Sequence, residues 1–378
     1  MTSLLDIACR DPIVARDGRP FGRGQSTRMR SLTWPTPSMV AGSLRATLGK
    51  QIDPAFAPST VEALLAVESA GVFPVVGDEL YLPAPQDCVV QGGRAIRARP
   101  DHAESAGCDL PSGVAPVVTT PDLDAGKPQP APAWWPTTTL ASWLAGNEVT
   151  IDGRFLTDPV VDVRTHARID DGGAAEDGEL FTTAALLLDR LPKYCSAPHV
   201  GRPSFEDITL SLRARGDART RDVLASLDTL HPFGGERRLA HWRAAERAKM
   251  WECPDVVRSA LTGATHVRMM LTTPAVFTAG WKPGWLNDDL IGAPPGCTIE
   301  LRLVGLAIRR WQAVSGWSLA GPSPGPKPIK RVVPAGGVYF FETICGTSQD
   351  LAGRWLEPVS DDLQDRRDGF GLATWGTW

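Results

Sequence analysis

The chain has 378 residues, enough for two domains, and 43% of them are hydrophobic, so each half can bury a core. Its formal net charge of −4 argues against indiscriminate polyanion binding but leaves room for a local basic surface. The sequence shows no apolar run long enough to cross a bilayer and no secretory signal, and its seven cysteines lack a CxxC spacing. We therefore expect a cytoplasmic protein with reduced thiols and no membrane contact.

Arginine dominates the basic residues, because only seven of the 39 are lysines. A GC-rich genome is one explanation, and the abundance of Ala, Gly and Pro fits it. Phosphate recognition is the other, since guanidinium groups bind phosphates bidentately and stack on bases. Composition leaves both explanations open.

The N-terminal region is predicted to begin with a strand at residues 11–16, and Gly18 marks the end of this segment. A loop rich in arginine follows it, with Arg19, Arg23, Arg28 and Arg30. The next helix is well delimited, because Thr36 can cap it, Pro37 suits its first position and Gly49 marks its exit. Its buried stripe is expected at Val40, Leu44, Thr47 and Leu48.

The middle of the first half predicts a helix near residues 61–69 and a hairpin with strands at 72–76 and 80–82. Residues 92–136 are rich in Pro and Gly without periodicity, which predicts a long loop or insertion. Residues 151–185 predict an inserted ribbon of two strands. Period-2 alternation places on one face of this ribbon Arg164, His166 and Arg168.

Both halves repeat one order of elements. After a strand at 205–213 and a helix at 218–230, a glycine-rich loop with Gly234 and Gly235 precedes the last strand of the first half. The second half predicts strands at 265–271, 297–308 and 332–341, a weak helix at 347–356, and a glycine-rich loop at 369–371. We therefore predict an α+β fold with one βαββαβ unit in each of two domains, residues 1–252 and 253–378.

Several short motifs stand in order along the chain: RDGRPF (16–21), WPTPS (34–38), EDGELF (176–181), GGER (234–237), LTTPAVF (271–277), GPKP (325–328) and VPAGGVYFFE (333–342). Together they resemble the RAMP superfamily of CRISPR ribonucleoproteins, specifically the group of the third subunit of Cmr (type III-B) effector complexes. The insertion at 92–136 has no counterpart in that pattern.

The resemblance implies two ferredoxin-like, RRM-like RAMP domains with glycine-rich loops and a β-ribbon thumb. It implies a non-catalytic subunit, with no cofactor or metal, that caps the 5′ end of CRISPR RNA by binding its repeat-derived tag. The implied partners are this RNA, the large polymerase-like subunit and the backbone subunits, with target RNA contacted indirectly, in antiviral defence.

The chemistry of single-stranded RNA fits several of these segments. Guanidinium groups, helix N-termini and backbone N–H groups at glycines all bind phosphate. The candidate RNA-binding residues are Arg19, Arg23, Arg28, Arg30, Arg45, Arg164, His166, Arg168, Gly234, Gly235, Arg237, Arg238, Lys327, Lys330, Arg331, Gly369 and Gly371. Ion pairing with Asp162, Asp170 or Asp171 is an equal alternative for the ribbon, and acidic neighbours weaken the case for the 369–371 loop.

Other classes of function receive less support. A metal-independent RAMP endoribonuclease would need a general base, and His166 and His231 are the histidines in suitable contexts, each with a structural role as its alternative. Cys195 and His199 lack two further metal ligands nearby. A tryptophan-rich sugar-binding module would predict a secreted chain with disulfides, and the sequence shows no sign of either.

Overall fold

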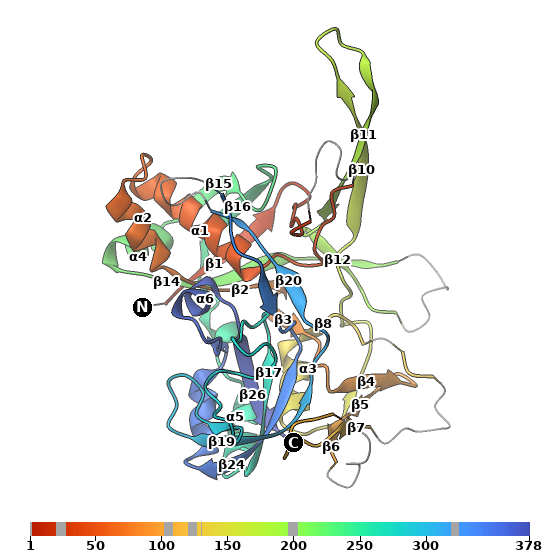
Figure 1. Ribbon diagram of the computed structural model, residues 1–378, viewed down its shortest axis with the longest axis vertical. Helices are drawn as coiled ribbons and strands as arrows, with labels where there is room; N and C mark the ends of the chain where they lie inside the picture. The colour runs from red at the N-terminus through yellow and green to blue at the C-terminus, as the bar shows by residue number, and fades with distance from the viewer. Residues whose placement is uncertain are drawn as a thin grey trace.

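The structure, a computed structural model, describes residues 2–19, 28–101, 109–119, 127–129, 131–195, 203–318 and 325–378. The fold is α+β, with two large sheets and several short ribbons whose named strands all pair antiparallel in the described residues. Figure 1 shows the two large sheets one above the other and a long ribbon projecting away from the body.

The first sheet has the order β15-β16-β1-β14-β2-β3-β8. Its strands are β15 (Asp228–Pro232), β16 (Leu239–Ala245), β1 (Thr2–Cys9), β14 (Thr209–Arg215), β2 (Glu68–Val76), β3 (Glu79–Pro83) and β8 (Trp134–Pro136). The predicted hairpin is confirmed as β2 and β3. The first strand was predicted wrongly at residues 11–16, because β1 pairs with β14 and β16 instead and occupies the sheet interior.

Helix α1 (Pro37–Ile52) confirms the helix predicted from its cap. The Thr36 hydroxyl accepts a hydrogen bond from the Met39 N–H at 3.3 Å, and the whole predicted stripe is buried. The helix continues one turn beyond Gly49. The neighbouring helices are α2 (Pro58–Leu65) and α4 (Ala218–Ala225), so the helix predicted at 218–230 is too long: its last residues enter β15.

The segment predicted as a long loop, 92–136, contains short strands. Within it lie β5 (Arg94–Arg97), β6 (Arg99–Pro100), β7 (Val117–Val118) and β8. Strand β5 pairs with β4 (Cys88–Gln91) and β9 (Val149–Thr150) outside the segment, and β6 pairs with β7. Trp134 and Trp135 at its end are buried, and α3 (Thr137–Leu144) follows them. The buried rings attach the end of the insertion to the protein core. The local composition of the segment does not reveal this packing.

The predicted ribbon is confirmed as β10 (Val161–Ile169) and β11 (Ala175–Leu186), which we call the thumb. It is the yellow-green ribbon extending from the body in Figure 1. The strand predicted at 205–213 divides at buried Ile208 into β13 (Phe205–Asp207), which pairs with β12 (Arg190–Pro192), and β14.

The second sheet has the order β18-β19-β24-β17-β26-β25. Its strands are β18 (Ile291–Gly292), β19 (Glu300–Ala307), β24 (Val338–Cys345), β17 (His266–Leu271), β26 (Leu372–Thr377) and β25 (Glu357–Pro358). The accompanying helices are the 3₁₀ helices η2 (Ala248–Trp251) and η3 (Ser348–Arg354), α5 (Asp255–Leu261) and α6 (Leu363–Asp368). The predicted βαββαβ order is wrong here in one respect: residues 272–299 between β17 and β19, all described, contain no helix.

Two short ribbons, β20 (Gln312–Val314) with β23 (Lys330–Val332) and β21 (Trp317–Ser318) with β22 (Gly325–Pro326), lie between β19 and β24 in the chain. The halves share one apolar core and a buried polar contact. Arg268 of β17 pairs with Asp87, and the Trp143 indole N–H donates to the same carboxylate at 3.0 Å. Removal of any partner would leave a buried polar group unsatisfied.

Candidate nucleic-acid interface

An extended segment, residues 13–16, brings three of the predicted RNA-binding elements together. Ile13 forms a β-bridge to Leu186 at the foot of the thumb, Val14 to Gly235 of the first glycine-rich loop, and Arg16 to Ser31 of the arginine loop. We call this segment the hub. It was predicted as a sheet strand, and its actual role is to connect the arginine loop to the thumb and the glycine-rich loop, which lie more than 150 residues further along the chain.

The arginine loop lies against the foot of the thumb. Arg28 forms a parallel bridge to Thr182, and the Met29 N–H donates to the Thr182 carbonyl at 2.8 Å. Arg28 and Arg30 are both exposed. Arg19 is exposed and pairs with Asp17 at 3.3 Å, while Arg23 lies outside the described residues. Arg28 thus adjoins the thumb, and the Arg30 carbonyl accepts a hydrogen bond from the Asp17 N–H at 3.2 Å.

The three predicted RNA-binding residues of the thumb already have partners within it. Arg164 contacts Asp162 at 2.7 Å, as the ion-pair alternative expected, and Arg168 contacts Glu176 at 3.1 Å. His166 stacks on Phe181, with ring centroids 5.1 Å apart. Exposed ion pairs of this kind contribute only about 0.2–1 kcal/mol, so a phosphate can replace the carboxylate at small cost.

The first glycine-rich loop packs against the hub. Gly234 has φ +79°, and a Cβ there would lie 2.7 Å from the Val14 carbonyl oxygen, so glycine is required. The N–H groups of Gly234 and Gly235 donate to Ser43 and Val14, which corrects the expectation that they face phosphate. Arg238 is half-buried, whereas Arg237 is exposed and forms no ion pair with the described residues.

A cleft of about 1370 Å³ lies between the halves beside the arginine loop. The first half contributes Arg19 and Arg30 to its lining, and the second half contributes the exposed Arg309. Asp158 also lines it; desolvation raises the pKa of this carboxyl, and the positive charge of Arg309 opposes the shift. The cleft therefore has guanidinium groups on both walls.

The Pro-rich basic patch of the second half is only partly free. Lys330 forms an ion pair with Asp365, and Lys327 is half-buried. Arg331 is exposed, with its guanidinium 4.9 Å from the ring centroid of Trp311. Arg309 and Trp311 were not among the predicted residues, although one signal in the sequence pointed to them: residues 301–341 contain no Asp or Glu.

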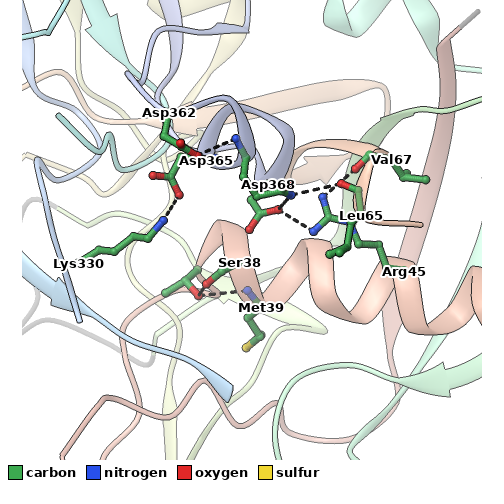
Figure 2. Close-up of polar contacts among 11 residues, drawn as sticks. Ser38, Met39, Arg45, Leu65, Val67, Lys330, Asp362, Asp365 and Asp368 are labelled. Carbon is green, nitrogen blue, oxygen red and sulfur yellow. Dashed lines mark hydrogen bonds and ion pairs between the residues drawn. The ribbon is translucent and has the colours of Figure 1, made fainter. Parts of the chain in front are cut away.

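Burial corrects three of the predicted RNA contacts, and the first of them, Arg45 of α1, pairs with Asp368 of α6 in Figure 2. Arg45 is buried, pairs with Asp368 at 2.6 Å and donates to the Val67 carbonyl at 2.8 Å. Gly369 and Gly371 are also buried, and a Cβ on either would lie 2.5 Å from Ser69 or Ser360 atoms. These residues approach protein, not solvent, and we omit them from the interface.

The two histidines considered for catalysis are hydrogen-bonded to threonines. His166 Nε2 lies 2.9 Å from Thr183 Oγ1, and His231 Nδ1 lies 2.9 Å from Thr47 Oγ1. Burial lowers the pKa of His231, which keeps the ring neutral at physiological pH. Within the described ranges, no three metal-ligating side chains cluster, and His199 lies outside those ranges.

A comparison with protein families decides which family the chain belongs to. The model of a CRISPR-associated protein, Cas_Cmr3, matches residues 5–378. The chain belongs to the Cmr3 family. This confirms the resemblance predicted from the motifs, which lie within the matched range. No curated protein matches this Cmr3-family chain.

Solved structures similar to this Cmr3-family chain are distant in sequence. A chain of type III-B Cmr-beta bound to cognate target RNA has 13% identity and a TM-score of 0.48, with 97% of this chain and 95% of that chain covered. A chain of the Csm3–Csm4 subcomplex of a type III-A interference complex has 7% identity and a TM-score of 0.38, with 89% and 92% covered. In the described part of the chain, no helix is long and apolar enough to span a bilayer.

Proposed function

We propose that this chain is a cytoplasmic RNA-binding subunit of a type III-B effector ribonucleoprotein in antiviral defence. It binds the repeat-derived 5′ tag of CRISPR RNA and joins the large polymerase-like subunit to the backbone subunits, which contact target RNA. Membership of the Cmr3 family supports the assignment of the chain to a type III-B effector complex. The observation that supports the RNA-binding role is the hub, which is bridged to the arginine loop, the thumb and the loop bearing Arg237.

We also propose that each large sheet is the core of a ferredoxin-like RAMP domain, with the boundary at residues 252/253. The support is the strand order β16-β1-β14-β2 in the first half and β26-β17-β24-β19 in the second. Both orders place the first strand between the third and the fourth, as antiparallel βαββαβ connectivity requires.

In this proposal, Arg28, Arg30 and Arg237 bind tag phosphates, and Arg164 and Arg168 exchange their carboxylate partners for phosphate where the tag meets the guide. Guanidinium groups suit this task because they present several donors in a fixed plane. Cleavage belongs to neighbouring subunits, and the threonine contacts of His166 and His231 support a structural role for both rings.

The test of tag recognition is the double substitution Arg28→Ala/Arg30→Ala in the full chain. We expect weaker binding of single-stranded RNA carrying the tag, measured by fluorescence anisotropy, and a smaller loss for tagless RNA. Arg94→Ala is the matched control, because Arg94 of the distant β5 is also an exposed arginine and forms an ion pair with Glu148. Unchanged binding of both RNAs by the double variant would reject the proposed loop contacts.

Incubation of the protein with repeat-containing RNA in EDTA tests the non-catalytic proposal. We expect intact RNA on a denaturing gel. Specific cuts that disappear in His166→Ala or His231→Ala would instead establish the endoribonuclease alternative.

A further inference from the structure

Trp311 lies on an exposed basic surface that the tag contacts above do not use. In the β20–β23 ribbon, Ala313 lies opposite Arg331, so Trp311 is the diagonal neighbour of Arg331 on the same face. The Arg331 and Arg310 guanidinium groups lie 4.9 and 5.9 Å from the Trp311 ring centroid. Even so, Trp311 remains 47% exposed.

The other face of this ribbon holds it against the protein. Val314 and Val332 are buried in a small cluster with Phe370, and Lys330 on the same face pairs with Asp365. The ribbon is therefore anchored by one face, and Trp311 and Arg331 occupy the face directed outward.

The charge around Trp311 favours a polyanionic ligand. Residues 301–341 contain six basic and no acidic residues, although the whole chain carries a net charge of −4. Arg310 and Arg331 form no ion pair with a carboxylate in the described part of the chain. Arg309, the next residue along, lines the cleft that also contains Arg19 and Arg30. An RNA strand that follows this cleft from the arginine loop would pass Arg309, which is two residues before Trp311 in the chain.

We infer that Trp311, flanked by Arg310 and Arg331, is a stacking platform for an unpaired base of single-stranded RNA, and that Arg309 binds the adjoining phosphate. Indole and guanidinium planes stack on any base, and isolated cationic groups bind the backbone. This inference rests on the proposed RNA-binding function and adds a contact on the second-half wall of the cleft.

The experiment measures binding of the full chain to labelled single-stranded RNA carrying the tag, over a series of salt concentrations. Trp311→Ala is expected to weaken binding about tenfold without changing the dependence of log affinity on log salt, because stacking neutralises no phosphate. Trp311→Phe is expected to restore most of the affinity. Arg309→Ala is expected to reduce the salt slope by about 0.7, the value for one phosphate on a single strand.

Trp317→Ala is the matched control, because Trp317 is 63% exposed on the neighbouring β21 and, within the described residues, no guanidinium group stacks on its ring. Equal binding by Trp311→Ala and this control, with wild-type binding intact, would overturn the platform and leave the tag proposal standing. Intact RNA binding with lost association of another subunit would assign Trp311 to a protein interface and also overturn it. Failure of the wild-type chain to bind RNA would overturn both proposals.

Discussion

The two glycine-rich loops of the molecule share a sequence pattern and differ in their surroundings. Each places glycines beside Phe and Arg before the last strand of its half. The loop at Gly234 packs on the hub and leaves Arg237 exposed, whereas the loop at Gly369 is buried against the first half. A glycine next to an arginine thus indicates that another backbone segment approaches closely. Whether the arginine is exposed or buried depends on which segment packs against the glycine.

The largest contrast is expected at the buried ion pair behind the second loop. Asp368→Ala leaves Arg45 buried without its carboxylate, which should lower the free energy of unfolding by about 3–5 kcal/mol. Urea denaturation measures this loss. The control Asp162→Ala removes the partner of exposed Arg164 and should change stability by less than about 1 kcal/mol. Similar effects of the two variants would break the comparison.

Gly369→Ala should destabilise the protein by more than about 1 kcal/mol, because the residue has φ +89° and its Cβ would meet the Ser69 carbonyl at 2.5 Å. The thermal midpoint should fall, while the RNA affinity of the folded protein should remain that of the wild type. A selective loss of RNA affinity with unchanged stability would return this loop to the RNA interface.

Substitution of the arginine beside each loop should affect RNA affinity at the first loop and protein stability at the second. Arg237→Ala should reduce the slope of log affinity against log salt by about 0.7, with stability unchanged. Arg366 donates to the Ser360 and Asp361 carbonyls at 2.9 and 2.8 Å, so Arg366→Ala should cost about 1–2 kcal/mol of stability and leave the slope intact. Anisotropy titrations and urea denaturation distinguish the two, and the reverse assignment would contradict the account.

The smallest expected effect concerns pH. Burial lowers the pKa of His231 on β15, at the stem of the first loop, so protonation favours the unfolded state, whose histidine titrates near 6.5. The unfolded chain binds more protons below that value, and stability should fall as the pH drops from about 7 to 5. His231→Gln should flatten this part of the profile in urea denaturation at each pH. An unaltered slope would assign the loss to other groups.

The sequence predicted elements whose signals are local. The Thr36 cap and Pro37 identify α1, and strict alternation identifies the thumb strand bearing Arg164. The prediction was wrong where contacts between residues far apart in the chain determine the structure. Residues 13–16 have the composition of a strand, yet their partners lie in three separate segments, two of them more than 150 residues away, and β1 lies inside the sheet because β14 and β16 pair with it on either side.

The candidate site shows the same division. Residue type identified Arg28, Arg30 and Arg237 as candidates, but no local pattern distinguishes them from Arg45, whose partner Asp368 lies 323 residues away. Trp311 was missed because only one of its two arginines, Arg310, is its neighbour in the sequence, whereas Arg331 is brought beside it by the β20–β23 register.

Crosslinking of tagged CRISPR RNA to the full chain, read out by mass spectrometry, tests most directly whether the hub surface holds the RNA. We expect crosslinked peptides that contain residues 28–30, 164–168 and 237, with the thumb crosslinks near the junction of tag and guide. Crosslinks confined to residues 366–371, or thumb crosslinks only at the far end of the guide, would contradict this placement of the RNA.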